Sequence, residues 1–493
     1  MGKSLNNYLN GSFTPSIGQE TLDIVNPSTL ETLGQTPLGT IEDVDKAVEY
    51  AKAAFFSWSQ VPAIDRVQPL FKLKMLLQDS VDEIATLIVK EHGKTFREAK
   101  GDILRGIQMV DVACGMPNLM MGESLQNIAP GIDCNTIRRS LGVFAGITPF
   151  NFPAMVPFWF WPFAVAAGNT YVLKPSERVP LTQMKIFELI SKCGFPDGVI
   201  NMVHGGKEVV NALLDHEDIA GISFVGSTPV AKHVYTRGSA NGKRVQALGG
   251  AKNYMVMLPD APVEQAVRAM VDSCYGCAGE RCLAASVLVG VGEAYHKMKK
   301  QVLIEVAKVV VGDGLDPKTT LGPVISKEAK ERIISDITTA IEQGAEILVD
   351  GREQTGEGYF VGPTVLDNIK TGTLMADKEI FGPVIGLMQV KTMDEAIDLI
   401  NGSNYANTTS IFTTNGGAAR DFINKVTPSM VGVNLGVPAP MAFFSFGGSK
   451  DSFFGDIKVH GASSVEFFTE KHTAMIRWYQ EGSNEVVSPL WKD

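Results

Sequence analysis

The run GVFAGI at residues 142–147 opens a region that closes with RVQALGG at residues 244–250. Between these two runs, short segments rich in β-branched and apolar residues alternate with longer segments of helical periodicity. Such alternation is typical of a parallel β-sheet wrapped by helices. We therefore predict an α/β fold whose first sheet is doubly wound, as in proteins that bind nucleotides.

Individual elements follow from this alternation. Strands are expected at 141–147, 170–173, 198–203, 219–225 and 244–248, and helices at 182–193, 207–214 and 229–237. Upstream, apolar positions at helical spacing predict a helix that starts at Thr40 and a helical stretch over 63–91. From Asn253 the alternation starts again, with strands at 254–258 and 286–291 and helices at 262–275 and 293–309, which predicts a second α/β domain.

Residues 465–479 carry β-branched and aromatic side chains around charges, and no neighbouring segment offers a partner strand. We interpret them as a strand added to another sheet. That sheet belongs either to a neighbouring subunit or to the same subunit, where the segment would form an edge strand.

Composition is that of an ordinary soluble globular protein. The 493 residues, 45% of them hydrophobic and 20% charged, suffice for two or three domains. A net charge of -10 without runs of Lys or Arg disfavours a nucleic-acid surface. Six cysteines and a start, Met1-Gly2-Lys3, without the features of a signal peptide predict a reducing, cytoplasmic location.

The apolar segment 147–168 has about the length of a membrane span. Four prolines argue against a spanning helix. They are Pro149, Pro153, Pro157 and Pro162. A buried helix entered from a proline-shaped loop fits better, and burying Asn151 in that loop would be costly unless its amide had a partner or a task.

Cys282 ends the run GERC at 279–282 and is the candidate nucleophile. The other five cysteines lie in apolar or helical surroundings and are expected in the core. They are Cys114, Cys134, Cys193, Cys274 and Cys277. The spacing of Cys274 and Cys277 is Cys-x-x-Cys, but without a second pair or a His cluster zinc is disfavoured, and a redox pair ranks below core packing.

Several segments together resemble the aldehyde dehydrogenase superfamily, in the family's order and over nearly the whole chain. They are PFNFP at 149–153, LKPSE at 173–177, FVGS at 224–227, GERC at 279–282 and EIFGP at 379–383. Within that superfamily the chain most resembles the CoA-acylating methylmalonate-semialdehyde (malonate-semialdehyde) dehydrogenases. Arg178, GGAKN at 249–253 and NLGVPAPMAFF at 434–444 carry this likeness.

The resemblance implies a doubly wound NAD-binding domain, an α/β catalytic domain and a small β extension for oligomerisation. The NAD-binding domain would comprise 1–124, 145–250 and a return at 441–464. The catalytic domain would span 251–440, and the oligomerisation segments would be 125–144 and 465–493. A homo-oligomer is expected, with a dimer and a tetramer both open.

The resemblance also assigns chemistry to two residues. The Cys282 thiolate would attack the aldehyde carbonyl and form a thiohemiacetal. Asn151 matches the amide that stabilises the oxyanion together with the Cys282 backbone N–H. A loop-capping amide is the competing structural interpretation of Asn151.

No Gly-x-Gly-x-x-Gly fingerprint occurs, so the usual dinucleotide-binding loop is missing. In its place, Gly226 at a strand end would allow close approach of NAD, and Ser227 would begin a helix whose N-terminus faces a phosphate. Lys174 and Glu177 match positions that contact the adenosine ribose, and a carboxylate there favours NAD over NADP. The resemblance adds Thr148, Phe150, Arg178, Gly249, Glu379 and Phe381 as further cofactor-binding candidates.

Arg105 and Arg281 match arginines that the subfamily directs at the carboxylate of a semialdehyde acid, although a surface ion pair is the alternative role for each. Most hydrolytic relatives carry Glu where this chain has Ala247, so the base that activates water is missing. A thiol such as coenzyme A would then accept the acyl group, after loss of carbon dioxide if the substrate is a 3-oxo acid, and no metal is required.

Two alternatives remain open. A hydrolytic aldehyde dehydrogenase would use another carboxylate, such as Glu280, as its base, and a non-catalytic dinucleotide-binding protein would share the fold alone. Methylmalonate and malonate semialdehyde differ by one methyl group, which a binding site discriminates weakly, so both are open as substrates.

Overall fold

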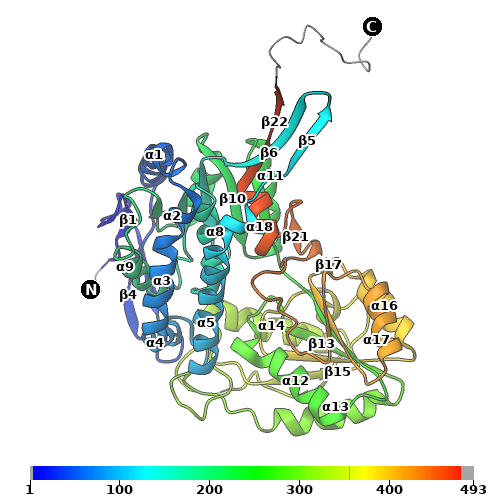
Figure 1. The fold of residues 1–493 in the computed structure, drawn as a ribbon. Helices are drawn as coiled ribbons and strands as arrows, with labels where there is room; N and C mark the ends of the chain where they lie inside the picture. The colour runs from blue at the N-terminus through cyan, green and yellow to red at the C-terminus, as the bar shows by residue number, and fades with distance from the viewer. Residues whose placement is uncertain (1–3, 355, 479–493) are drawn as a thin grey trace.

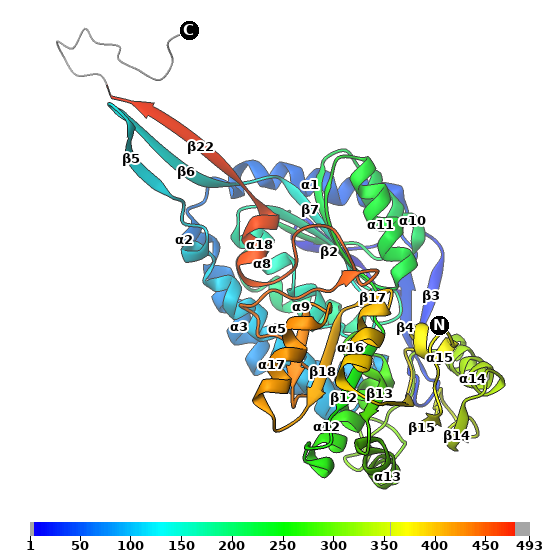
Figure 2. The ribbon, with the colours of Figure 1, turned by 90° about the vertical axis from the view of Figure 1, so that its right-hand side faces the viewer.

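Two α/β bodies and a projecting arm make up the computed structural model, which describes residues 4–354 and 356–478. Figures 1 and 2 show the arm extending from the body that contains the N-terminal elements. The first body is built on an eight-stranded sheet and the second on a seven-stranded sheet. The predicted α/β class is therefore confirmed.

The first sheet has the order β2-β1-β9-β8-β7-β10-β11-β21, and its five central strands run parallel. The central strands are β9 (Ile200–Met202), β8 (Thr170–Lys174), β7 (Val143–Ile147), β10 (Ile219–Val225) and β11 (Arg244–Leu248). The outer strands are β1 (Asn7–Leu9), β2 (Ser12–Thr14) and β21 (Phe453–Phe454). The five predicted strands are all present, and their near-continuous burial reflects helices on both faces.

One face of this sheet is covered by α1 (Ile41–Trp58), α10 (Lys207–Asp215) and α11 (Thr228–Ala240), and the other by α8 (Trp161–Ala166) and α9 (Leu181–Ile190). The helical stretch predicted over 63–91 is divided into α2 (Ala63–Arg66), α3 (Gln68–Asp79) and α4 (Val81–His92). They are followed by α5 (Phe96–Cys114) and α6 (Met116–Leu119), and a separate hairpin joins β3 (Thr21–Val25) to β4 (Thr32–Pro37).

The apolar segment 147–168 forms a loop and two short buried helices, α7 (Met155–Phe158) and α8. This matches the prediction of a buried helical segment entered from a proline-shaped loop. Within residues 4–354 and 356–478, no helix is both long enough and apolar enough to cross a membrane.

The second sheet has the order β14-β15-β16-β13-β12-β18-β19. Its strands are β12 (Asn253–Met257), β13 (Ala285–Val291), β14 (Glu346–Val349), β15 (Thr364–Asp367), β16 (Val384–Val390), β18 (Thr408–Phe412) and β19 (Met430–Val433). Its helices are α12 (Val263–Tyr275), α13 (Ala294–Val306), α14 (Lys327–Glu342), α15 (Leu374–Asp377), α16 (Met393–Gly402) and α17 (Gly416–Lys425). A small ribbon pairs β17 (Tyr405–Ala406) with β20 (Ser449–Lys450). The predicted restart of the alternation at Asn253 is confirmed.

The arm is a three-stranded antiparallel sheet of order β22-β6-β5. Its strands are β5 (Ser124–Ala129), β6 (Ile132–Ser140) and β22 (Thr469–Arg477). β22 pairs with β6 over its whole length, so the C-terminal strand joins a sheet of its own chain. Both views show that this sheet stands away from the two bodies.

The prediction of a strand over 465–479 was wrong for its first part, because residues 465–468 end helix α18 (Gly461–Phe468). Val465, Phe467 and Phe468 are all buried there. A strand places adjacent side chains on opposite faces, so it could not bury both phenylalanines against one core. Residues 479–493 lie outside the described part of the chain.

Candidate active site

Cys282 follows a strained turn that leads from α12 toward β13. The turn is the 3-10 segment Gly276–Gly279, whose last three residues have left-handed φ values of 51°, 53° and 74°. A Cβ on Gly279 would stand 2.1 Å from the carbonyl oxygen of Gly382, so glycine is required at this position. Consecutive left-handed residues persist only where surrounding contacts enforce them, and such strain clusters at functional sites.

Two asparagine amides fix the backbone of the candidate nucleophile. Nδ2 of Asn253 and Nδ2 of Asn407 each donate to the Cys282 carbonyl oxygen at 2.9 Å. Burial, with a smaller contribution from the Glu379 carboxylate, raises the pKa of the Cys282 thiol to about 12. Cys282 is therefore a neutral thiol at pH 7, and a positive charge nearby would favour the nucleophilic thiolate.

The Asn151 side chain reaches the same loop from the carboxyl end of β7. It is buried, and its Nδ2 donates to the carbonyl oxygen of Glu280 at 2.9 Å. An amide nitrogen carries two N–H groups, so the second remains for another acceptor. The fold thus brings together Asn151 and Cys282, the two residues expected to act on the aldehyde.

Glu280 points into the protein interior. Its Oε1 accepts the Ile325 N–H at 3.3 Å, its Oε2 lies 4.0 Å from His92 Nε2, and its side chain is 1% exposed. Burial raises the pKa of this carboxyl group to about 8. A protonated carboxyl group sealed from solvent is a poor base for activating water, so the structure offers no support for the hydrolytic alternative through Glu280.

The residues expected at the adenosine ribose lie at the carboxyl end of β8. Lys174 Nζ and Glu177 Oε2 form an ion pair of 2.6 Å. Burial raises the pKa of Glu177, but the charge and hydrogen bond of Lys174 outweigh it and hold the pKa below its usual value. Thr148 donates its N–H to the Lys174 carbonyl oxygen at 3.1 Å, which ties the ends of β7 and β8 together. Glu177 is therefore an ionised, partly exposed carboxylate near the carboxyl end of a parallel strand, the edge at which open α/β sheets generally bind ligands.

Gly226 and Ser227 occupy the connection from β10 into α11. Ser227 is the N-cap of α11 and makes no side-chain capping bond, so the first N–H groups of that helix are not capped by its hydroxyl. At the neighbouring strand end, the Gly249 N–H donates to the Ser452 carbonyl oxygen at 3.0 Å. This arrangement has the features of a site for an anionic group at a helix N-terminus.

Glu379 belongs to the second body, as the Cys282 loop does, and its carboxylate lies near enough to Cys282 to affect the pKa of the thiol. A Cβ on Gly250 would stand 2.3 Å from Glu379 Oε2, so the close approach of this carboxylate depends on glycine. Burial raises the pKa of Glu379 to about 7. Nearby, Phe381 has a left-handed φ of 51° and meets the Phe150 ring edge-on, with centroids 6.0 Å apart. This contact joins a cofactor candidate of the first body, Phe150, to one of the second, Phe381.

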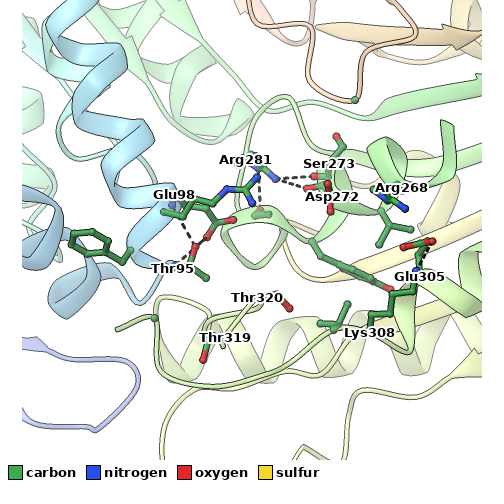
Figure 3. Close-up of a pocket in the computed structure, with 18 of the residues that line it drawn as sticks. Thr95, Glu98, Arg268, Asp272, Ser273, Arg281, Glu305, Lys308, Thr319 and Thr320 are labelled. Carbon is green, nitrogen blue, oxygen red and sulfur yellow. Dashed lines mark hydrogen bonds and ion pairs between the residues drawn. The ribbon is translucent and has the colours of Figure 1, made fainter. Parts of the chain in front are cut away.

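Arg281 is bound to the end of α12. Its Nη2 donates to the Asp272 carbonyl oxygen at 2.7 Å and its Nε to the Gly276 carbonyl oxygen at 3.0 Å. Figure 3 shows the guanidinium directed toward Asp272 and Ser273. All three residues line a pocket of about 790 Å³. An arginine that caps the last carbonyls of a helix has a structural role, which weakens its assignment to a substrate carboxylate.

Arg105 makes fewer hydrogen bonds within the protein than Arg281 does. It is half-buried on α5, and its Nη1 donates to Gln108 Oε1 at 3.1 Å and to Met441 Sδ at 3.3 Å. Both partners are uncharged, so the guanidinium retains its charge for an anionic ligand. Arg178, by contrast, is exposed and lies 3.5 Å from Glu328, which places it in a surface ion pair.

Sequence reasoning missed several residues of the site and misjudged one cysteine. Asn253 stood inside the quoted run 249–253 without a role, whereas nothing in the sequence singled out Asn407 or Lys94, which donates to the Asn151 carbonyl oxygen. Four of the five cysteines expected in the core are buried, and Cys134 on β6 is only half-buried.

Comparisons with known proteins agree over nearly the full length. The profile of the aldehyde dehydrogenase family matches residues 13–474. The chain is 48% identical over 472 residues to malonate-semialdehyde dehydrogenase 1 of Geobacillus kaustophilus, covering 95% of this chain and 96% of that protein. It is 46% identical over 480 residues to malonate-semialdehyde dehydrogenase of Bacillus cereus, covering 97% and 99%.

Solved structures give the same result. One is a protein from Sinorhizobium meliloti 1021, assigned as a methylmalonate-semialdehyde dehydrogenase and solved with NAD. It superposes with a TM-score of 0.96 at 41% sequence identity, and the match covers 97% of this chain and 99% of that one. Methylmalonate-semialdehyde dehydrogenase from Oceanimonas doudoroffii gives 0.95 at 42% identity, with the same coverage. The aldehyde dehydrogenase fold predicted from the sequence is confirmed, and the chain belongs to the aldehyde dehydrogenase family of enzymes.

Proposed function

We propose that this enzyme oxidises malonate semialdehyde or methylmalonate semialdehyde with NAD and transfers the acyl group to coenzyme A, losing carbon dioxide and giving acetyl-CoA or propionyl-CoA. The observation that carries the proposal is the placement of Cys282 beside the Asn151 amide, in a chain whose position 247 is a fully buried alanine. The similarity to malonate- and methylmalonate-semialdehyde dehydrogenases supports the choice of substrate.

The chemistry of the cofactor candidates fits NAD. Glu177, ionised beside Lys174, would accept a hydrogen bond from a ribose hydroxyl, and the N-terminus of α11 at Ser227 would receive a phosphate. Glu379, which packs against Gly250, would accept hydrogen bonds from the second ribose. When bound, NAD supplies the hydride acceptor and a cationic ring whose charge favours the Cys282 thiolate.

The first chemical step belongs to Cys282 and Asn151. The thiolate attacks the aldehyde carbon, and the electron pair of the carbonyl moves to its oxygen. The free N–H of the Asn151 amide and the Cys282 backbone N–H stabilise this oxyanion. Oxidation of the resulting thiohemiacetal leaves a thioester on Cys282.

Loss of carbon dioxide, which precedes release of the acyl group, involves the substrate's own carboxylate. In a thioester whose α-carbon bears a carboxylate, the bond between these two carbons breaks, carbon dioxide leaves, and the electron pair left on the α-carbon forms an enolate stabilised by the same donors. A proton from solvent completes the acyl group. Because Ala247 provides no base for water, the thiol of coenzyme A, a better nucleophile, takes the acyl group and frees Cys282.

The test is a product assay with malonate semialdehyde and NAD, with and without coenzyme A. We expect a burst of NADH in both reactions. Steady turnover should follow only in the reaction that contains coenzyme A, with acetyl-CoA as its product. Equal steady rates in both reactions, with free acid as the product, would contradict the acylating mechanism and favour the hydrolytic one.

A further inference from the structure

We propose that Lys94, paired with Asp102, is a positioning residue that sets the Asn151 amide for oxyanion stabilisation. The inference rests on the proposed function, because it assumes the oxyanion role of Asn151. It assigns a task to a buried charge pair that the chemistry described above does not use.

The Lys94 ammonium contacts the Asn151 loop at two adjacent residues. Its Nζ donates to the Asn151 carbonyl oxygen at 2.5 Å and lies 4.0 Å from the centroid of the Phe152 ring. The Lys94 side chain is 0% exposed. The main chain at Asn151 is thus held by Lys94, while its side chain is held by the Glu280 carbonyl oxygen.

Asp102 extends the same restraint along the loop. Its Oδ2 lies 3.5 Å from Lys94 Nζ, and its Oδ1 accepts the Met155 N–H at 2.7 Å. Gln183 Nε2 adds a bond of 2.6 Å to the Pro153 carbonyl oxygen. Residues 151–155, which carry the candidate oxyanion donor, are therefore held at three alternate positions, from the α4–α5 connection, α9 and α5.

Lys94 itself stands in a rigid connection between two capped helices. Gly93 ends α4 with a left-handed φ of 93°, and Thr95 begins α5 in a reciprocal capping box with Glu98. Glu98 also accepts the Cys277 N–H at 2.7 Å through Oε1. Figure 3 shows Thr95 and Glu98 meeting beside the loop that contains Arg281. The link that carries Lys94 is thus joined directly to the turn before Cys282.

A fully buried ion pair is weak evidence for a stabilising role, since desolvation of both charges offsets their attraction. A well-packed apolar side chain would serve stability as well. Lys94 contacts the Asn151 carbonyl oxygen and the Phe152 ring directly, and its partner Asp102 holds Met155, so the pair acts on the single segment 151–155. That concentration favours a positioning role over a general contribution to folding.

The experiment is a double-mutant cycle with Lys94→Met, Asn151→Ala and the double variant, measured as single-turnover NADH formation with saturating NAD and aldehyde. We expect Lys94→Met to slow this step by about 10- to 100-fold, and the double variant to be no slower than Asn151→Ala alone. The dissociation constant of NAD and the melting temperature are measured for each variant. Lys100→Met, on the exposed side of α5, is the matched control and should retain the wild-type rate.

The outcomes distinguish the oxyanion role of Asn151 from the positioning role of Lys94. If Asn151→Ala keeps the wild-type rate, the proposed function loses its oxyanion donor. If Asn151→Ala is slow but Lys94→Met is not, or if the two losses multiply in the double variant, only the positioning role is overturned. Should Lys94→Met fail to fold, Asp102→Asn takes its place in the cycle, because it keeps the size and the acceptor for Met155 while removing the charge; an additive result there overturns the inference equally.

Discussion

One N–H of the Asn151 amide is bound to the carbonyl oxygen of Glu280, 2.9 Å away and two residues before Cys282. The bond fixes the orientation of the amide relative to the nucleophile loop. Because only one of its two N–H groups is used, the other can serve the oxygen of a substrate without any rearrangement. The stabilising group and the nucleophile thus share one local framework, although 131 positions separate them in the chain.

Asn151→Ala should slow formation of the Cys282 thioester by about 10²- to 10³-fold, the effect of removing one oxyanion donor. Binding of NAD should be unchanged, because the amide faces the nucleophile loop. Single-turnover NADH formation measures the first quantity and a fluorescence titration the second. A parallel loss of NAD affinity would show that Asn151 instead holds the shape of the cofactor cleft.

Alkylation of Cys282 by iodoacetamide should follow the raised pKa of its thiol, which burial brings to about 12. Only the thiolate reacts, so without NAD the rate should rise about tenfold for each pH unit from roughly pH 7 to 10 and reach no plateau. Adding NAD should increase the rate at neutral pH. Cys282→Ala provides the background of the other cysteines and should bind NAD while showing no aldehyde oxidation. A plateau below about pH 9 in the cofactor-free enzyme would contradict the raised pKa.

Arg105→Leu should selectively impair aldehydes that carry a carboxylate, by about 10- to 100-fold in kcat/KM, equivalent to about 1.4–2.8 kcal/mol. Its partners are uncharged, so its loss leaves the fold largely intact. Turnover of malonate semialdehyde and of propanal gives the comparison.

Arg281→Leu should behave differently, because its guanidinium holds the carbonyls at the end of α12. We expect a lower melting temperature, because each hydrogen bond lost contributes about 0.5–1.5 kcal/mol, and similar losses of activity with both aldehydes. A variant of Arg281 that spares propanal but not malonate semialdehyde would restore the sequence-based assignment of this arginine to the substrate carboxylate.

Glu177→Gln should raise the use of NADP relative to NAD. The Lys174 charge keeps the pKa of Glu177 below its usual value, so the carboxylate is ionised at neutral pH and repels a 2′-phosphate. The substitution removes this repulsion and frees Lys174 to attract the phosphate. We expect the ratio of kcat/KM for NADP to that for NAD to rise on the order of tenfold, about 1.4 kcal/mol. An unchanged ratio would place cofactor selection elsewhere.

The sequence by itself predicted the α/β class, the family, and the order and approximate bounds of most strands, because burial on both faces imposes near-continuous apolar runs that are visible locally. It also pointed to Cys282 and Asn151, whose surrounding motifs are local. It misjudged residues 465–468, where β-branched and aromatic side chains suggested a strand but burial on one side favoured a helix.

Only the tertiary structure decided which charges are free and which are committed. Arg105 and Arg281 look equivalent in sequence, yet packing leaves one with uncharged side-chain partners and directs the other to the end of α12. Glu280 stands two residues before Cys282 in the chain, yet its carboxyl group faces His92 in the protein interior. Lys94 reaches Asn151 across 57 positions. Such relationships depend on distances between segments far apart in sequence, which no local pattern encodes, whereas strand and helix periodicity is a property of neighbouring residues.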